Sequence, residues 1–108
     1  CMSAHADDTW TAWDTRREVT FEMLELADMG QTRYIAAHPN QFQEANPFFG
    51  PHPSKRTVTG WFVAGMGAHP LLAVVLPGEL RPVWQWGGIV LEASVVAHNA
   101  KLGVKFNF

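Results

Sequence analysis

The sequence is short of both charge and cysteine. Charged residues make up 17% of the 108 positions, against roughly 25% in an ordinary soluble domain. The net charge is −2, and no basic stripe is present that would neutralise phosphates, which argues against nucleic acid as a partner. The single cysteine excludes a disulfide within the chain. The length predicts one domain with a modest core.

Common catalytic motifs are also missing. The sequence has no GxGxxG motif and no P-loop, and no serine or threonine stands in a nucleophile elbow. None of the five histidines has the HxxxH or HxH spacing typical of metal ligands. We therefore expect a protein that is not an enzyme and has no cofactor beyond a lipid. His52, His69 and His98 are left as weak candidates for a metal site.

Aromatic and small apolar residues are abundant instead, with five tryptophans and seven phenylalanines. Segment 57–76 contains no Asp, Glu, Lys or Arg, and its length matches the ~30 Å core of a bilayer. Gly60, Ala64, Gly67 and Ala68 are spaced for close helix packing in lipid, although His69 and Pro70 interrupt the run. A helix buried in the core of a soluble oligomer is the alternative.

The periodicity predicts an all-α fold, a small bundle of about three helices. Residues 1–8 form a tether and residues 9–38 the first helix. Residues 39–54 form a linker that its X-Pro pairs stiffen, and Ser54 is expected to cap the next helix. Residues 55–76 and 83–101 form an apolar hairpin that would span a membrane or fill an oligomer core. The tail at 102–108 alternates in polarity and predicts a short strand.

Two groups of polar residues stand out within the apolar pattern. Asp28, Gln31 and Thr32 share one helix face, and we expect them to bond to Asn46 and His52 of the linker. A ligand contact at this face is the alternative. The loop charges counted along the sequence do not fix the orientation of the hairpin in a membrane. One end carries Lys55 and Arg56 and the other carries Arg81 and Glu79, and this difference is too small for the positive-inside rule.

Glu92 is the most costly residue to bury in the second apolar segment, because a carboxylate at the centre of a membrane helix costs roughly 2.5–3.5 kcal/mol. His69 lies at a similar height in the expected hairpin, so the two are predicted to form a buried pair. An interhelix hydrogen bond is one interpretation and a proton site is another. With His52 and His98, the pair supports an alternative function, a small metal- or proton-binding membrane protein.

The sequence given starts at Cys1, as a mature bacterial lipoprotein does after its signal peptide is removed. We expect a lipid anchor on Cys1, which would hold the chain firmly at a membrane when it is multiply acylated. A truncated chain or a cloning remnant is the alternative. Residues 2–6 show no pattern, as is expected of a tether.

The run from Asp28 to Phe62 resembles a group of small bacterial membrane proteins, many of them phage- or prophage-encoded and with lipoprotein signals. Their signature is D-x-x-Q-T…I…P…E-x-N-P-x-x-G-x-H-P-S. It is matched here by Asp28, Gln31, Thr32, Ile35, Pro39, Glu44, Asn46, Pro47, Gly50, His52, Pro53 and Ser54. The resemblance implies an envelope location and a phage connection, and it brings no established activity.

These observations lead to one functional hypothesis. We expect a non-enzymatic lipoprotein of the bacterial cell envelope, anchored in a membrane and facing the periplasm. The sequence does not decide between the inner and the outer membrane. It would act through a protein partner in the envelope or phage particle, as in superinfection exclusion or assembly. The low charge and the many aromatic residues also predict a homo-oligomer.

Overall fold

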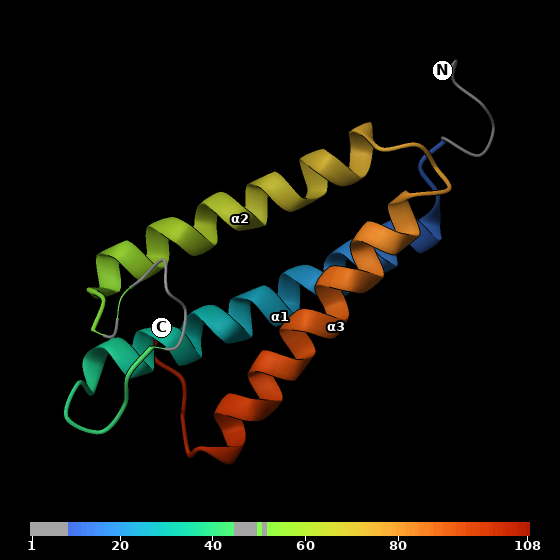
Figure 1. Ribbon diagram of the computed structural model, residues 1–108. Coiled ribbons are helices and arrows are strands. Elements are labelled where there is room, and N and C mark those ends of the chain that lie inside the picture. The colour runs from blue at the N-terminus through green and yellow to red at the C-terminus, as the bar shows by residue number, and fades with distance from the viewer. Residues whose placement is uncertain (1–8, 45–49, 51) are drawn as a thin grey trace.

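The structure, a computed structural model, describes residues 9–44, 50 and 52–108 and contains three helices in this part of the chain. They are α1 (Ala12–Ala37), α2 (Lys55–Val75) and α3 (Arg81–Lys101), shown in Figure 1. The predicted all-α bundle of three helices is therefore confirmed. Each helix begins and ends close to the bounds expected from the sequence.

Side chains at the helix starts explain where α1 and α2 begin. Thr11 and Asp14 form a capping box, in which the Thr11 hydroxyl accepts from Asp14 N and the Asp14 carboxylate accepts from Thr11 N. Ser54 caps α2 by accepting from Thr57 N at 3.1 Å, as predicted. α3 has no such side-chain cap and carries Pro82 in its first turn, where a missing N–H costs nothing.

α1 is the central element of the bundle. It packs extensively against both α2 and α3, whereas α2 and α3 have little contact with one another. In Figure 1, α1 and α3 run in the same direction and α2 runs opposite to both. The expected hairpin therefore exists as a chain turn at residues 76–80, but the two apolar helices do not pack as a pair. Each one is held by polar side chains of α1.

The C-terminal tail does not form the strand expected for residues 102–108, and no strand occurs among the described residues. Asn107 N–H donates instead to Gly30 O of α1 at 2.9 Å, and Arg33 Nε donates to Asn107 O at 3.1 Å. The ring of Phe108 lies directly on Gly30, where a Cβ would overlap it. A single short segment finds no strand to pair with here, so it packs on a helix that a glycine leaves open.

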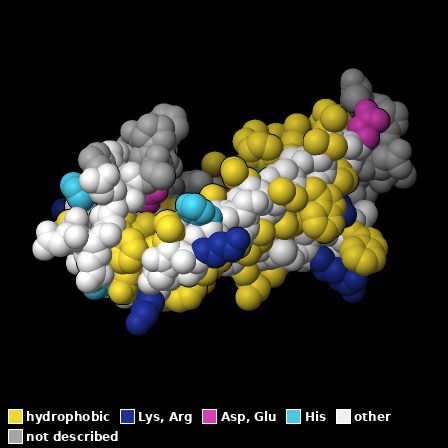
Figure 2. All heavy atoms as spheres, turned by 60° about the horizontal axis from the view of Figure 1, so that its bottom comes forward, with side chains coloured by type: hydrophobic (Ala, Val, Ile, Leu, Met, Phe, Trp, Pro, Cys, Tyr) yellow, Lys and Arg dark blue, Asp and Glu magenta, His cyan; other side chains and the backbone are white. Residues whose placement is uncertain are grey.

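Polarity is partly inverted in this bundle, although Phe21, Ile35, Val58, Phe62 and Ile89 also contribute apolar side chains to its interior. Much of the interior is polar or charged, the buried members being Asp14, Glu18, Glu25, Asp28, Gln31, Thr32, His69, Arg81 and Gln85. Large apolar side chains are exposed on all three helices, including Val19, Met23 and Leu26 of α1, Trp61, Val63 and Leu71 of α2, and Val83, Trp86 and Val90 of α3. Hydrophobic side chains accordingly cover much of the face shown in Figure 2.

Of the helices in the described part of the chain, α2 is the one long and apolar enough by composition to cross a membrane, and only 22% of its apolar window is buried in the bundle. α3, predicted to span with it, contains Gln85, Glu92, His98 and Asn99, and does not pass the same test. Gln85 is fully buried and Glu92 partly so. The polar residues that make α3 fail this test thus include residues that face α1 and are not on its outer surface.

Candidate functional site

The buried polar residues follow one another along α1 and form the most distinctive internal feature of the protein. We call this set of residues, together with the half-buried Glu92 of α3, the polar column: Asp14, Glu18, Glu25, Asp28, Gln31 and Thr32 of α1, His69 of α2, and Arg81 and Gln85 of α3. Its α1 members recur at helical spacing, so they share the face that α2 and α3 cover. It consists of three parts with different chemistry.

The first part is an ion-pair network around Arg81 at the start of α3. The Arg81 guanidinium donates through Nη1 to Asp14 Oδ2 at 3.1 Å, and through Nε and Nη2 to the carbonyl oxygens of Ala73 and Leu76. Asp14 also pairs with Arg17. Arg81 thus joins the start of α1 to the end of α2, and its buried charge is balanced by Asp14.

Gln85 continues this network one turn further along α3. Its side-chain amide donates to Asp14 O at 2.9 Å and to Glu18 Oε1 at 3.1 Å, and its Oε1 accepts from Arg17 Nε at 2.7 Å. Every polar atom of the buried amide is therefore bonded. A residue that looks out of place in an apolar sequence segment thus links three charged residues of α1, Asp14, Arg17 and Glu18.

The second part is built around His69, and it corrects a prediction. His69 does not pair with Glu92: its Nδ1 lies 2.7 Å from Glu18 Oε2. The ring is stacked between Phe21 and Trp84, with centroids 3.6 and 4.6 Å away, and Trp84 Nε1–H donates to His69 O. The predicted pair is wrong because α1 lies between the apolar helices and offers His69 a nearer carboxylate.

Gly88 of α3 makes room for this histidine. A Cβ at position 88 would lie 2.8 Å from both His69 Nε2 and the Phe21 ring, whereas nothing lies within 4 Å of a Cβ at Gly87. We expect Gly88→Ala to lower the free energy of unfolding by about 1–3 kcal/mol, the usual cost of overpacking.

Gly87→Ala is the matched control, one residue away on the same helix. It should leave stability unchanged or raise it by about 0.5–1 kcal/mol, since alanine is the better helix former. Thermal unfolding of the purified variants measures both. Equal effects of the two substitutions would contradict the close packing of His69 and Phe21 on Gly88.

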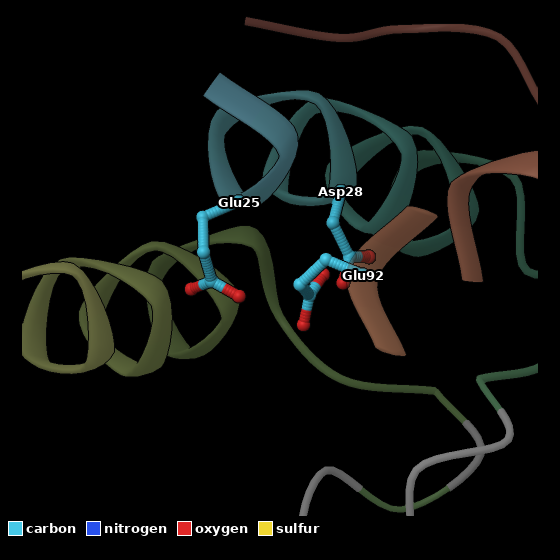
Figure 3. Close-up of side chains that lie close together, drawn as sticks. All are labelled: Glu25, Asp28 and Glu92. Atoms are coloured by element: carbon cyan, nitrogen blue, oxygen red, sulfur yellow. The ribbon is translucent and has the colours of Figure 1, made fainter. Parts of the chain in front are cut away.

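The third part is an acidic cluster, defined here as Glu25, Asp28 and Glu92. One carboxyl oxygen from each lies within 4.8 Å of the other two, and Figure 3 shows Glu25 and Asp28 coming from α1 and Glu92 from α3. Glu25 and Asp28 are buried, and Thr32 Oγ1 donates to Asp28 Oδ1 at 3.1 Å. A cluster of three carboxyl groups repels unless it holds a proton or a cation.

Two further observations concern this acidic cluster. Within the described residues, the buried Oε2 of Glu92 has no hydrogen-bond partner, although burial of an unpaired carboxyl oxygen is costly. A cavity of about 460 Å³ reaches the cluster, and its lining includes Asp28, Thr32, Glu92 and His98. A small cation could therefore reach the carboxyl oxygens of Asp28 and Glu92 without opening the bundle.

The candidate ligands named from the sequence are only partly brought together. Glu92 and His98 line the same cavity, but His69 is bonded to Glu18 elsewhere in the bundle and His52 is exposed ahead of α2. The sequence reasoning did not single out Glu25, although its spacing from Asp28 on one helix face was a usable signal.

The predicted polar cluster on α1 forms contacts, but mostly not the expected ones. Asp28 and Thr32 bond to each other. Gln31 donates through Nε2 to Val96 O at 3.1 Å and accepts from Asn99 Nδ2 at 3.2 Å, so this face bonds to α3. Of the expected linker partners, Asn46 lies outside the described residues and His52 is exposed.

No similarity to a known protein adds to the geometry of this site. The site is an inward-facing column of ion pairs, a stacked histidine and an acidic cluster, enclosed by helices with apolar outer faces. Its chemistry must therefore be argued from geometry. Comparisons with protein-family models, with curated proteins and with solved structures found no match to this chain.

Proposed function

We propose that the protein is a non-enzymatic membrane protein of the bacterial envelope, whose three helices lie together in the bilayer and which acts through protein–protein contacts. The observation that carries the membrane location is the partly inverted polarity: several charged side chains are buried between the helices, while many large apolar side chains are exposed along them. A soluble monomer rarely exposes contiguous apolar patches beyond a few hundred Å². In lipid, ionisable residues face the bundle interior and pair with one another.

Helix lengths support the same proposal. α2 and α3 each have 21 residues and α1 has 26, which at ~1.5 Å per residue is enough for a ~30 Å hydrocarbon core. By composition alone, α2 is the one helix of the described residues that qualifies as a membrane span. α1 and α3 carry polar residues that the bundle encloses. The mean hydropathy of each whole helix therefore underestimates how apolar its outer face is.

Extraction from membranes tests the proposal. We expect the protein in the membrane fraction of cells, resistant to alkaline carbonate and released by detergent. A homo-oligomer that buries its apolar faces between soluble chains would be released by carbonate, or would be found in the soluble fraction. Either result would refute a membrane-embedded bundle and support the oligomer.

Lipidation of Cys1 stays a prediction, because residues 1–8 lie outside the described part of the chain. Incorporation of a labelled fatty acid into the wild-type protein, and its loss in Cys1→Ser, would support a lipid anchor. A role in superinfection exclusion predicts that cells expressing the protein resist infection by related phages. Normal plating of such phages at full expression would exclude that role and leave assembly as the interaction to test.

Cation or proton binding is the second candidate function. It is favoured by the convergence of Glu25, Asp28 and Glu92 on one point beside a cavity. Carboxylate oxygens suit hard cations such as Ca²⁺, Mg²⁺ and Mn²⁺. Binding of one of these ions would relieve the repulsion and complete the bonding of Glu92 Oε2, which is unpaired among the described residues.

A neutral substitution in the acidic cluster tests whether its carboxyl groups repel one another. We expect Glu92→Gln to raise the free energy of unfolding by about 1 kcal/mol or more, because two unit charges 4 Å apart repel by ~4 kcal/mol at an effective dielectric constant of about 20. Thermal unfolding in detergent with EDTA measures this effect. Glu79→Gln, an exposed acid in the α2–α3 turn, should change stability by less than about 0.5 kcal/mol.

The same variants test for a bound ion. If the acidic cluster binds Ca²⁺ or Mn²⁺, the ion should raise the unfolding temperature of the wild-type protein, and Glu92→Gln should abolish that rise. Glu79→Gln should retain it. No effect of either ion on the wild-type protein would rule out a divalent cation and leave a shared proton as the compensating charge.

A further inference from the structure

Exposed charges are distributed unevenly between the two ends of the bundle. The end of α1, the start of α2 and the C-terminal tail lie together at one end in Figure 1, where Arg33 donates to Thr59 Oγ1 and to Asn107 O. The exposed cations here are Lys55 and Arg56 in the first turn of α2, Lys101 at the end of α3, and Lys105 in the tail. We call this set of residues the basic end.

The opposite end, which we call the turn end, comprises the start of α1 and the α2–α3 turn. Two of its cations are held within the bundle by one carboxylate: Arg81 is buried against Asp14, and Arg17 also pairs with Asp14. Arg16 is exposed there, and so is Glu79. In the described part of the chain, Glu79 is the only fully exposed acidic residue, and Glu44 is the half-buried acid nearest the basic end.

We propose that the basic end lies in the cytoplasmic leaflet against anionic phospholipid headgroups, which places the turn end on the opposite side of the membrane. This inference rests on the membrane location proposed above and adds its orientation and its lipid partner. Lys and Arg near the ends of membrane helices favour the cytoplasmic side, whose leaflet carries the anionic lipids that attract them.

The position of the basic side chains fits lipid headgroups. Lys55 is the first residue of α2, and Lys101 is the last residue of α3. Each therefore stands where an apolar helix leaves the hydrocarbon core. Leu102, Phe106 and Phe108 are exposed beside them. Apolar groups with neighbouring long cationic side chains suit the membrane interface, where the stem stays in apolar surroundings and the charge reaches the headgroups.

Reporter fusions after Phe108 test the orientation in bacterial cells. We expect a fused green fluorescent protein to fluoresce and a fused alkaline phosphatase to be inactive, because the former works in the cytoplasm and the latter in the periplasm. The opposite result would overturn the orientation. It would leave the membrane location standing provided the fusions still resist carbonate extraction, and release by carbonate would overturn the membrane location itself.

Lipid binding tests the partner. Native mass spectrometry of the detergent-solubilised protein should show preferential retention of phosphatidylglycerol over phosphatidylcholine. We expect this preference to fall roughly fivefold for each of Lys55→Gln, Arg56→Gln, Lys101→Gln and Lys105→Gln at low ionic strength, while Arg16→Gln at the turn end leaves it unchanged.

High salt provides a measurement that needs no variant. The preference of the wild-type protein for phosphatidylglycerol should weaken steeply as salt rises, since surface electrostatics are screened within about 10 Å at 0.1 M. Equal retention of the two lipids by the wild-type protein, or an equal loss on Arg16→Gln, would overturn the proposed contact with anionic headgroups at the basic end.

Discussion

Replacing Arg81 by methionine is expected to lower the free energy of unfolding in detergent by about 3–5 kcal/mol, the cost of removing one partner from a buried ion pair. Arg81 is only 2% exposed and donates to Asp14 as well as to the carbonyl oxygens of Ala73 and Leu76. Methionine keeps much of the volume of the side chain but leaves these acceptors without their donor.

Arg81→Lys separates charge from geometry. Lysine keeps the positive charge but has no planar fork, so it cannot reach Asp14 and both carbonyl oxygens at once. We expect the free energy of unfolding of Arg81→Lys to lie between that of the wild-type protein and that of Arg81→Met. Arg16→Gln, an exposed arginine that stacks over Trp13, is the control and should change stability by less than about 1 kcal/mol.

A double variant shows whether the effect belongs to the ion pair. Arg81→Met combined with Asp14→Asn should cost clearly less than the sum of the two single changes, because the second substitution removes the charge that the first left unpaired. Thermal unfolding in one detergent compares all the variants. A loss under 1 kcal/mol for Arg81→Met, or strict additivity in the double variant, would mean that this network does not hold the three helices together.

Local features of the fold could be predicted from the sequence. The helical periodicity, together with the proline and glycine residues that mark helix ends and turns, predicts the three helices correctly. Ser54 is also correctly predicted as the cap of α2. These features depend on a few neighbouring residues. The alternating polarity of the tail predicts a strand, and this prediction is wrong because the contacts that place the tail are with Gly30 and Arg33, far away in the sequence.

The contacts between helices could not be predicted in the same way. Glu92 and His69 were paired because a hairpin of α2 and α3 would bring them to one height, but α1 lies against both helices and supplies Glu18 to His69. Helical spacing identifies which residues share a face, and it does not say which helix covers that face. For the same reason the meeting of Glu25 and Asp28 with Glu92 required the structure.

The inverted polarity also revises how the apolar segments are understood. In the sequence, the polar residues of α3 count against a membrane span, whereas in the bundle Gln85 bonds to Arg17, Asp14 and Glu18. A buried polar group that is fully bonded no longer opposes insertion as an isolated one does. The polar column is therefore compatible with three helices in lipid, provided that they insert as one bundle.

Placing a carboxylate on the outer face of α2 should prevent stable insertion. Val63 lies near the middle of α2 and is 59% exposed in the bundle. We expect Val63→Asp to disfavour insertion by about 2.5–3.5 kcal/mol, the cost of an aspartate at the centre of a membrane helix. The fraction of protein that resists carbonate extraction should fall sharply, and its level in cells should fall with it.

The same substitution has the opposite meaning for a soluble monomer. There an exposed valine replaced by aspartate changes stability by less than about 0.5 kcal/mol and improves solubility. Val63→Leu is the control, since it keeps the position apolar and should leave extraction unchanged. Val90→Asp makes the equivalent change on the outer face of α3, where Val90 is 62% exposed. Failure of both aspartate variants to insert would support lipid around the whole bundle, whereas normal yield and solubility of Val63→Asp would refute it.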